Sequence, residues 1–298
     1  MAAPFFSIII PAYNRAKVLP QSIASIVNQT YKDFEIIVVD DGSKDNTKLV
    51  VANLNLPNLK YIYQDNAERS AARNNGIRNA AGQYICFLDS DDFYLENHLQ
   101  TLYEKISENK FDEALYFVNY NVLQNGVITK PTLATFTGDS CSYLLCNSVV
   151  PVRVCIHHKI LKEFKFDEGI VIVEDTVLWC NIATKYKVHH IPEHTVLYQL
   201  HDDNSVLIQK NCFLPRLKGL QKMFDEKHIQ DAIEKKLRNI VISDCYFGIA
   251  RHYEFVKKFW PMLYNLLISI LYLPNYHDSK KKLYMIYAYI FNKPSNNY

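Results

Sequence analysis

The sequence lacks a strong excess of charge of either sign. Its 33 Lys and Arg residues nearly balance 31 Asp and Glu residues, which leaves a formal net charge of +2 at pH 7. Because there is also no stripe of interleaved aromatic and basic residues, nucleic acid is not expected as a partner. With 49% hydrophobic and 21% charged residues over 298 positions, the chain is typical of a globular protein with a large buried core.

Paired cysteine motifs are also missing. The seven cysteines are an odd number and none forms a C-x-x-C motif, so they are expected to be reduced thiols. The N-terminus, residues 1–4, lacks the basic start and long apolar stretch of a signal peptide. Both observations predict a protein of the cytoplasm, where thiols stay reduced.

No glycine-rich phosphate loop follows the first apolar segment. Residues 11–15 read Pro-Ala-Tyr-Asn-Arg and contain no glycine. A sugar nucleotidyltransferase would be expected to bind its nucleotide through such a loop beside the first strand. The sequence therefore disfavours this class of enzyme, which stays as an alternative.

Short apolar runs alternate with helical segments along the first hundred residues. Four runs predict buried strands: residues 5–10, 34–39, 59–63 and 84–88. Apolar residues at helical spacing separate the first three runs, and a small-residue stretch at 70–81, ended by Gly82, precedes the fourth. Strands and helices in this order predict an α/β fold with a parallel sheet.

A cluster of carboxylates ends the fourth run. Asp89, Asp91 and Asp92 follow its last apolar residue, with Ser90 among them. Open α/β sheets bind ligands at the carboxyl ends of their strands, and Mg²⁺ usually binds one or two carboxylates together with substrate phosphates. The pattern therefore predicts a site for a divalent metal and a diphosphate. The alternative is a solvated acidic turn that caps a helix near Asn97.

Five motifs in a fixed order resemble those of the family 2 glycosyltransferases, which have the GT-A fold. The motifs are residues 7–14, 25–31, 38–43, 72–74 and 88–92. The resemblance is strong from residue 5 to about residue 100, thinner to about residue 210 and absent beyond. It implies a Rossmann-like α/β fold with a mostly parallel sheet flanked by helices. It also implies inverting transfer of a sugar from a nucleotide donor, with uracil as the preferred base.

The resemblance implies donor-binding roles for residues in these motifs. The ring of Tyr13 would lie against the nucleobase, and Asp41 would accept a hydrogen bond from the base. Arg73 would lie near the base or the diphosphate, Arg15 and Arg69 are looser candidates, and Asp89 would face the ribose. The predicted donor-binding set is completed by Pro11, Ala12 and Ser90.

One position departs from the family pattern. Relatives commonly have a glycine near Glu68, whereas this chain has Glu68 followed by Arg69. The departure leaves the backbone conformation of that loop open.

For the metal, the resemblance implies Mn²⁺ or Mg²⁺ bound by Asp91 or Asp92, and which of the two binds directly stays open. His201 ends a strand-like segment at 196–201. It is a further candidate, either as a metal ligand or as a donor to the departing diphosphate. An ordinary surface histidine is the alternative.

Two acids, Glu174 and Asp175, interrupt the hydrophobic segment 170–179. They are similar to the Glu-Asp motif of the family, in which the second acid is usually the base and the first orients donor or acceptor. Sugar transfer needs such a base, because the attacking hydroxyl must lose its proton. The alternative is that Asp175 only caps the helix that follows.

The C-terminal part has a different composition. Residues 259–276 contain no charged residue, Lys257 and Lys258 precede them, and three lysines follow at 280–282. The stretch is long enough for a transmembrane helix, but two prolines and two asparagines disfavour spanning. An interfacial position on an anionic membrane is predicted, and helices that cover the catalytic domain are the alternative.

We therefore expect a catalytic domain at 1–210 and a helical C-terminal region at 211–298. The predicted function is inverting transfer of a sugar from a nucleotide donor, with UDP expected, to a glycan hydroxyl. The acceptor is expected to be lipid-linked and held in the inner leaflet, and the enzyme to be cytoplasmic, bacterial and peripherally bound to the inner membrane. A non-catalytic, membrane-associated module that binds nucleotide sugars is the second alternative.

Overall fold

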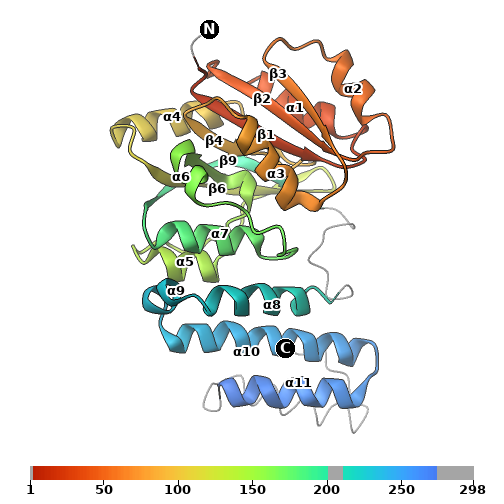
Figure 1. Ribbon diagram of the computed structural model, residues 1–298, viewed down its shortest axis with the longest axis vertical. Helices are drawn as coiled ribbons and strands as arrows, with labels where there is room; N and C mark the ends of the chain where they lie inside the picture. The colour runs from red at the N-terminus through yellow and green to blue at the C-terminus, as the bar shows by residue number, and fades with distance from the viewer. Residues whose placement is uncertain (1–2, 201–210, 274–298) are drawn as a thin grey trace. The chain divides into compact units, whose positions relative to one another are not determined.

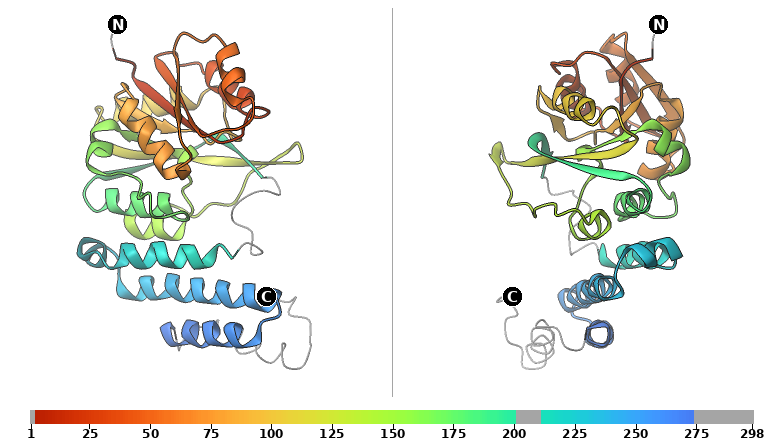
Figure 2. Two further views of the ribbon diagram at one scale, coloured as in Figure 1. Left: turned by 45° about the vertical axis from the view of Figure 1, so that its right-hand side comes forward. Right: turned by 90° about the vertical axis from the view of Figure 1, so that its left-hand side faces the viewer.

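The computed structural model describes residues 3–200 and 211–273, and the chain divides into two compact units, 1–202 and 203–298. Both units are drawn in Figures 1 and 2. The predicted domain boundary at residue 210 and the predicted metal ligand His201 lie outside the described residues.

A nine-stranded sheet forms the centre of the first unit, in the order β3-β2-β1-β4-β8-β6-β9-β5 with β7 paired to β6. The first four strands are β1 (Phe6–Ala12), β2 (Phe34–Asp41), β3 (Leu59–Gln64) and β4 (Tyr84–Phe87). Their mutual pairings are all parallel, and they coincide with the four apolar runs that predicted strands. The order reverses at β1, between β2 and β4, and open α/β sheets bind ligands at such a reversal.

The other half of the sheet mixes the two strand directions. Its strands are β5 (Phe93–Tyr94), β6 (Ala114–Gln124), β7 (Val127–Thr129), β8 (Val154–His157) and β9 (Lys187–Gln199). β8 is antiparallel to both β4 and β6, whereas β6 and β9 are parallel. Of the segment predicted as a strand at 196–201, residues 196–199 are the end of β9, which begins nine residues earlier than predicted, at Lys187.

Helices flank this sheet, as predicted (Figure 1). They are α1 (Leu19–Val27), α2 (Thr47–Asn53), α3 (Glu68–Asn79), α4 (His98–Glu108), α5 (Ser140–Cys146), α6 (His158–Glu163) and α7 (Glu174–Ala183), with a short 3₁₀ helix at Pro151–Arg153. The predicted helices after residue 70 and after residue 174 are thus present as α3 and α7.

The second unit consists of helices in its described part. They are α8 (Phe213–Phe224), α9 (Lys227–Ala232), α10 (Lys235–Phe255) and α11 (Phe259–Tyr272). α10 packs against both α8 and α11. Of the helices in the described ranges, none combines the length and the apolar character needed to cross a membrane.

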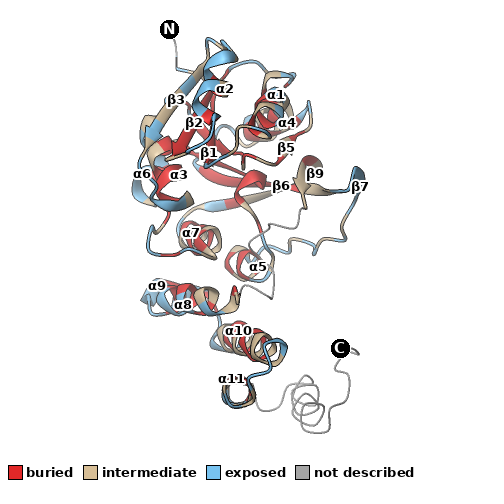
Figure 3. Cartoon of the chain, turned by 90° about the vertical axis from the view of Figure 1, so that its right-hand side faces the viewer, coloured by how far each residue is buried: buried red, intermediate tan, exposed pale blue. Residues whose placement is uncertain are grey.

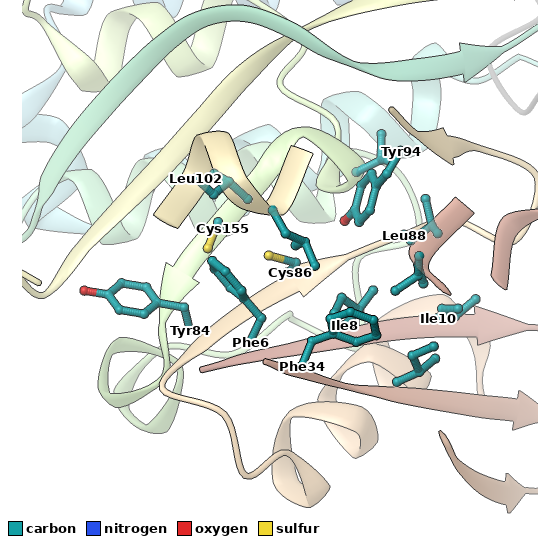
Figure 4. Close-up of a cluster of buried hydrophobic side chains, with 14 of the residues drawn as sticks. Phe6, Ile8, Ile10, Phe34, Tyr84, Cys86, Leu88, Tyr94, Leu102 and Cys155 are labelled. Carbon is teal, nitrogen blue, oxygen red and sulfur yellow. The ribbon is translucent and has the colours of Figure 1, made fainter. Parts of the chain in front are cut away.

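The core of the first unit lies on both faces of its central strands. Phe6, Ile8 and Ile10 of β1 point into one cluster with Cys86 of β4 and Leu102 of α4 (Figure 4). Residues that alternate with these are buried as well, because helices cover the opposite face of the sheet. Burial on both faces explains why these strands appear in the sequence as continuous apolar runs.

Helix α3 lies unusually close to strand β1 on the opposite face. A Cβ atom built on Gly76 of α3 would lie 2.4 Å from Cγ2 of Ile9, well inside van der Waals contact. Only glycine therefore allows this approach. The contact fixes how far α3 stands from the sheet, and α3 carries Arg73 one turn earlier.

Gly76→Ala is expected to destabilise the first unit by about 1–3 kcal/mol, the usual cost of overpacking. The sign of the change in unfolding free energy is diagnostic, because Gly→Ala inside a helix ordinarily stabilises a protein by about 0.5–1 kcal/mol. Urea unfolding followed by Trp179 emission, in a Trp260→Phe background, measures the effect. Arg78→Ala, at an exposed position of the same helix, is the control and should stay within about 0.5 kcal/mol. A higher urea midpoint for Gly76→Ala than for the unmodified chain would contradict the close contact between Gly76 and Ile9.

Candidate functional site

The parallel register brings the loops after β1, β2 and β3 to one edge of the sheet. Ala12 pairs with Asp40, and Asp41 pairs with Gln64, at the carboxyl ends of these strands. The loops after β1 and β2 are then joined by hydrogen bonds. The backbone N–H of Asn14 donates to Oγ of Ser43 at 2.8 Å, and Oδ1 of Asn14 accepts from the N–H of Lys44 at 2.8 Å.

Three residues of the predicted donor-binding set lie at the end of β1 and directly after it. Ala12 is buried at the end of the strand, Pro11 is half-buried, and Tyr13 leaves 43% of its surface exposed. Asn14 has a φ of 54°, a left-handed conformation that asparagine adopts more readily than most residues. The turn therefore presents the Tyr13 ring at the edge of the sheet, available to a planar ligand.

Asp41 is buried and held by two donors from the loop after β3. Its Oδ1 accepts from Nε2 of Gln64 at 2.7 Å and from the N–H of Ala67 at 2.9 Å. Among the described residues, no donor contacts Oδ2. Gly42 has a φ of 81°, so Asp41 also precedes a tight turn. Sequence reasoning missed Gln64, whose position at the end of β3 was the available signal.

The four residues of the acid cluster, 89–92, face different environments. The side chains of Asp89 and Asp91 are 29% and 24% exposed, and Asp91 lies 3.9 Å from the guanidinium of Arg15. Ser90 is buried, and its carbonyl accepts from Oγ of Ser22 at 2.9 Å. The alternative of an acidic helix cap does not hold, because β5 separates the acids from α4, and Asn97 makes no side-chain capping bond.

Asp92 is buried, unlike the half-buried Asp89 and Asp91. Its Oδ1 accepts from the backbone N–H of Gln199 at 2.8 Å, which ties the acid cluster to the end of β9. Burial, reinforced by the charge of Asp89, raises the pKa of Asp92 well above its usual value. Asp92 thus has a structural partner, whereas Asp91 is more accessible to a metal.

Arg73 connects the acid cluster to α7. The side chain is 2% exposed, and its two terminal nitrogens donate to Asp89 at 2.8 Å and to Glu174 at 3.0 Å. Burial disfavours its charge, but the two carboxylates outweigh burial and raise the pKa of Arg73. Arg73 thus lies between two acids that are 85 positions apart in the sequence, and its place near the base or diphosphate stays a prediction.

Asn74, the next residue, holds the segment that leads into α7. Its Nδ2 donates to the carbonyl of Phe166 and to Oε1 of Glu168, both at 2.9 Å, and its Oδ1 accepts from the N–H of Phe166 at 3.1 Å. Helix α3 therefore positions α7 through two consecutive side chains.

Glu174 and Asp175 begin α7 but have different partners. Glu174 is buried and pairs with Arg73, and Nε of Arg69 lies 3.5 Å from the same carboxylate. Asp175 is half-buried, and its Oδ1 accepts from the N–H of Thr176 at 2.6 Å. Within residues 3–200 and 211–273, its Oδ2 has no donor. The bond to Thr176 satisfies one amide of the first turn, and it leaves the second oxygen available.

The environment of Asp175 makes its carboxylate more basic than usual. Burial and the neighbouring charge of Glu174 raise its pKa to about 6, although Thr176 and Arg73 act in the opposite direction. A carboxylate with this pKa is deprotonated at neutral pH and still accepts a proton readily. Asp175 therefore has the protonation state and the available oxygen that a general base needs.

Two strained backbone positions lie beside these charges. Glu68 has a φ of 70°, a left-handed conformation that costs roughly 1–2 kcal/mol for a residue other than glycine. Val173, directly before Glu174, has a φ of 67°, which is rare for a β-branched residue. Arg69 bridges the two positions, because its Nη2 also donates to the carbonyl of Val171 at 3.1 Å. Nothing in the sequence signalled Val173.

The described part of the chain contains no group of three or more His, Cys, Asp or Glu residues arranged to hold a metal. The accessible oxygens of Asp89 and Asp91 nevertheless match the one or two carboxylates that Mg²⁺ uses when phosphates supply other ligands. The residues present thus fit a metal that binds together with a diphosphate.

Comparison with known sequences identifies the family. A sequence model described as Glycosyl transferase family 2 matches residues 7–168. A Campylobacter jejuni protein named GalNAc(5)-diNAcBac-PP-undecaprenol beta-1,3-glucosyltransferase is 30% identical, and the match covers 90% of this chain and 88% of that protein. The Escherichia coli UDP-Glc:alpha-D-GlcNAc-diphosphoundecaprenol beta-1,3-glucosyltransferase WfgD is 27% identical, with 83% and 94% covered.

Some relatives are much longer than this chain. Two uncharacterised glycosyltransferases from Rickettsia bellii and Rickettsia conorii are each 28% identical, and the chain covers 35% and 40% of their lengths.

Solved structures share the fold. Residues 1–349 of Staphylococcus aureus TarS in complex with UDP-GlcNAc align with a TM-score of 0.66 at 17% identity, over 97% of this chain and 92% of that one. The mannosyltransferase PcManGT from Pyrobaculum calidifontis, in complex with GDP-Man and Mn²⁺, aligns with a TM-score of 0.58 at 15% identity, over 99% and 89%. The predicted fold class is therefore confirmed.

Arg73→Met is expected to destabilise the first unit by about 3–5 kcal/mol, because Glu174 loses its buried, hydrogen-bonded partner and keeps only the partly exposed Arg69, 3.5 Å away. Arg69→Gln is the matched control. Its guanidinium is 37% exposed and 3.5 Å from the same carboxylate, so the loss should be below about 1 kcal/mol. Urea unfolding measures both variants, and Arg73→Met combined with Glu174→Leu should recover part of the loss. Equal effects of the two arginine variants would show that Arg73 is not the residue joining these segments.

Proposed function

Because the chain belongs to glycosyl transferase family 2, we propose that it transfers a sugar from a UDP-sugar to a hydroxyl group of a glycan carried on a polyprenyl diphosphate. The observation that carries this proposal is the arrangement around Arg73. The arginine pairs with Asp89 of the acid cluster and with Glu174, the residue before Asp175. The ion pairs therefore connect the acids proposed to bind the metal to the turn that carries the basic carboxylate of Asp175.

The proposed donor site uses the edge formed by β1, β2 and β3. The exposed ring of Tyr13 offers a stacking surface for a nucleobase, and Oδ2 of Asp41 offers an acceptor for the imide N–H of uracil. Cytosine has no N–H at that position, so this acceptor favours uracil. Two similar proteins support this choice: the E. coli enzyme is named for UDP-Glc, and the TarS structure is a complex with UDP-GlcNAc.

A divalent metal, Mn²⁺ or Mg²⁺, is proposed to bind at Asp91, with Asp89 beside it and the donor phosphates completing its ligands. When bound, it supplies positive charge that stabilises the departing diphosphate. Arg15, 3.9 Å from Asp91, is close enough to add to that charge. Asp92 holds the cluster in place through Gln199, and His201 stays a proposed further ligand.

Asp175 is proposed to take the proton from the acceptor hydroxyl as that oxygen attacks the anomeric carbon. Direct attack on the face opposite the leaving diphosphate inverts the configuration at that carbon. Glu174 keeps the turn in position through Arg73 and, by its negative charge, keeps Asp175 basic. The chain's own residues thus account for both the proton transfer and the placement of the base.

The acceptor is proposed to be lipid-linked. The C. jejuni and E. coli relatives carry undecaprenol diphosphate acceptors in their names, and each match covers more than four fifths of both proteins. Such an acceptor is anchored in a bilayer, which supports a peripheral position at the inner leaflet of the inner membrane. A membrane-associated module that binds nucleotide sugars without transferring them is the alternative, and turnover discriminates the two.

Asp175→Asn should lower sugar transfer by about two to four orders of magnitude, because asparagine keeps the bond to Thr176 but accepts no proton. In the unmodified chain, kcat/KM should fall as the pH drops through about 6, where Asp175 becomes protonated. Product formation from a UDP-sugar and a polyprenyl-diphosphate glycan across pH 5–9 measures both effects.

Two controls accompany this variant. Asp139→Asn alters a helix-capping acid outside the site and should leave the rate unchanged. UDP affinity, measured by calorimetry, should survive in Asp175→Asn. A collapse of UDP affinity with transfer largely retained would assign Asp175 to donor binding instead.

Measurements of UDP affinity should distinguish the contact of Asp41 with the nucleobase from the contact of Asp91 with the metal. Asp41→Asn should weaken UDP binding by roughly tenfold to a hundredfold, with or without Mn²⁺, because a charge-assisted hydrogen bond is lost. Asp91→Asn should bind UDP in Mn²⁺ only as tightly as the unmodified chain does in a chelator. Calorimetric titrations with UDP measure all four cases. Unchanged Mn²⁺ dependence in Asp91→Asn would remove Asp91 from the metal site.

A further inference from the structure

Helix α11 of the second unit is apolar on both of its faces. None of its 14 residues is charged. One face packs against α10, with Met262 and Leu266 buried beside Ala250. Ser243 and Ser269 fix this contact, because each hydroxyl donates to the other residue's carbonyl, at 2.8 Å and 2.7 Å.

The opposite face of α11 carries a continuous exposed stripe. Trp260, Tyr264, Leu267 and Leu271 are 75%, 65%, 49% and 78% exposed. Their spacing of four, three and four residues places them on one side of the helix. Figure 3 shows α11 with its exposed side turned away from α10. A helix that is hydrophobic all round is ordinarily buried, so this stripe has an unusual composition for a face in water.

Positive charge lies at one end of the stripe. The turn between α10 and α11 exposes Phe255 and Val256, 62% and 40%, and the exposed residues Lys257 and Lys258 follow. Large apolar side chains beside two lysines, with Trp and Tyr among them, are the composition of segments that lie at a membrane surface.

We propose that the stripe of Trp260, Tyr264, Leu267 and Leu271, together with the 255–258 turn, binds the surface of an anionic lipid bilayer. The apolar side chains enter the boundary between headgroups and acyl chains, and the two lysines contact lipid phosphates. α11 lies in the plane of the bilayer, because a 14-residue helix is only about 21 Å long and cannot cross a hydrocarbon core of about 30 Å.

The size and charge of the surface favour lipid over a second copy of the chain. A helix face of roughly 20 Å by 10 Å is small beside the roughly 800 Å² per partner of a stable protein interface. Interfacial binding needs less area, since attraction between lysines and anionic headgroups adds to burial of the apolar residues. That this surface brings the enzyme to a lipid-linked acceptor rests on the proposed function. That it binds vesicles does not.

Trp260 gives a direct assay in the full chain, because the only other tryptophan, Trp179, is fully buried in the first unit. Vesicles of phosphatidylcholine with phosphatidylglycerol should shift the emission to shorter wavelength. Vesicles that contain brominated phosphatidylcholine and phosphatidylglycerol should quench it. Trp260→Phe should show neither change. Lys257→Gln with Lys258→Gln should weaken binding by about tenfold to thirtyfold at low salt and far less at high salt.

Leu267→Ser with Leu271→Ser should reduce flotation with vesicles by at least about tenfold. The control, Val127→Ser with Ile128→Ser, removes apolar residues that are 61% and 56% exposed on β7 and should leave flotation unchanged. Hydrolysis of the UDP-sugar in detergent should be the same in all these variants. Absence of hydrolysis in the unmodified chain would count against the proposed function, whereas the vesicle assays test membrane binding alone.

Three results would overturn the proposal that the stripe binds a membrane surface. The first is vesicle binding that the stripe variants do not reduce. The second is short-wavelength Trp260 emission in buffer at concentrations where sedimentation gives a monomer, because the chain itself would then cover the stripe. The third is a dimer in sedimentation that Leu267→Ser with Leu271→Ser dissociates, which would assign the stripe to a second copy.

Discussion

The candidate site depends on the two ion pairs of Arg73. A fully buried guanidinium is costly unless carboxylates surround it, and here Asp89 and Glu174 do so at hydrogen-bonding distance. Removing either acid would leave a buried charge with fewer partners, so the three residues stabilise one another as a unit. Because the acids come from the loop after β4 and from the start of α7, the same charges that make the fold locally stable also set the distance between the acid cluster and Asp175.

The first half of the fold could be predicted from the sequence because its strands are buried on both faces. Continuous apolar runs at β1, β2 and β4 follow directly from that burial. The second half could not be predicted in the same way. β6 and β9 meet through pairings that join Ala114 to Lys187, and the position of β8 between β4 and β6 depends on contacts that local residue patterns do not encode.

The site shows the same division. The sequence predicted that Asp41 and Asp89 stand at strand ends and that Asp175 precedes a helix, and the structure has them at the end of β2, after β4 and in the first turn of α7. The sequence could not tell which carboxylate of the acid cluster turns inward, since Asp91 and Asp92 are adjacent and chemically identical. Burial and the bond from Gln199 now distinguish Asp92. The left-handed conformation of Val173 had no sequence signal either, because nothing about valine suggests it.

The absent side chain of Gly76 sets a geometric tolerance for the whole site. Accommodating one methyl group would require α3 to move about 1 Å from Ile9, from 2.4 Å to an ordinary carbon contact of about 3.5 Å. The nitrogens of Arg73 lie 2.8 Å and 3.0 Å from their carboxylates, and hydrogen bonds weaken beyond about 3.2 Å. The displacement of α3 that one added carbon atom would require is thus larger than the lengthening that the hydrogen bonds of Arg73 can tolerate. A residue that no substrate touches therefore limits how accurately the acids can be aligned.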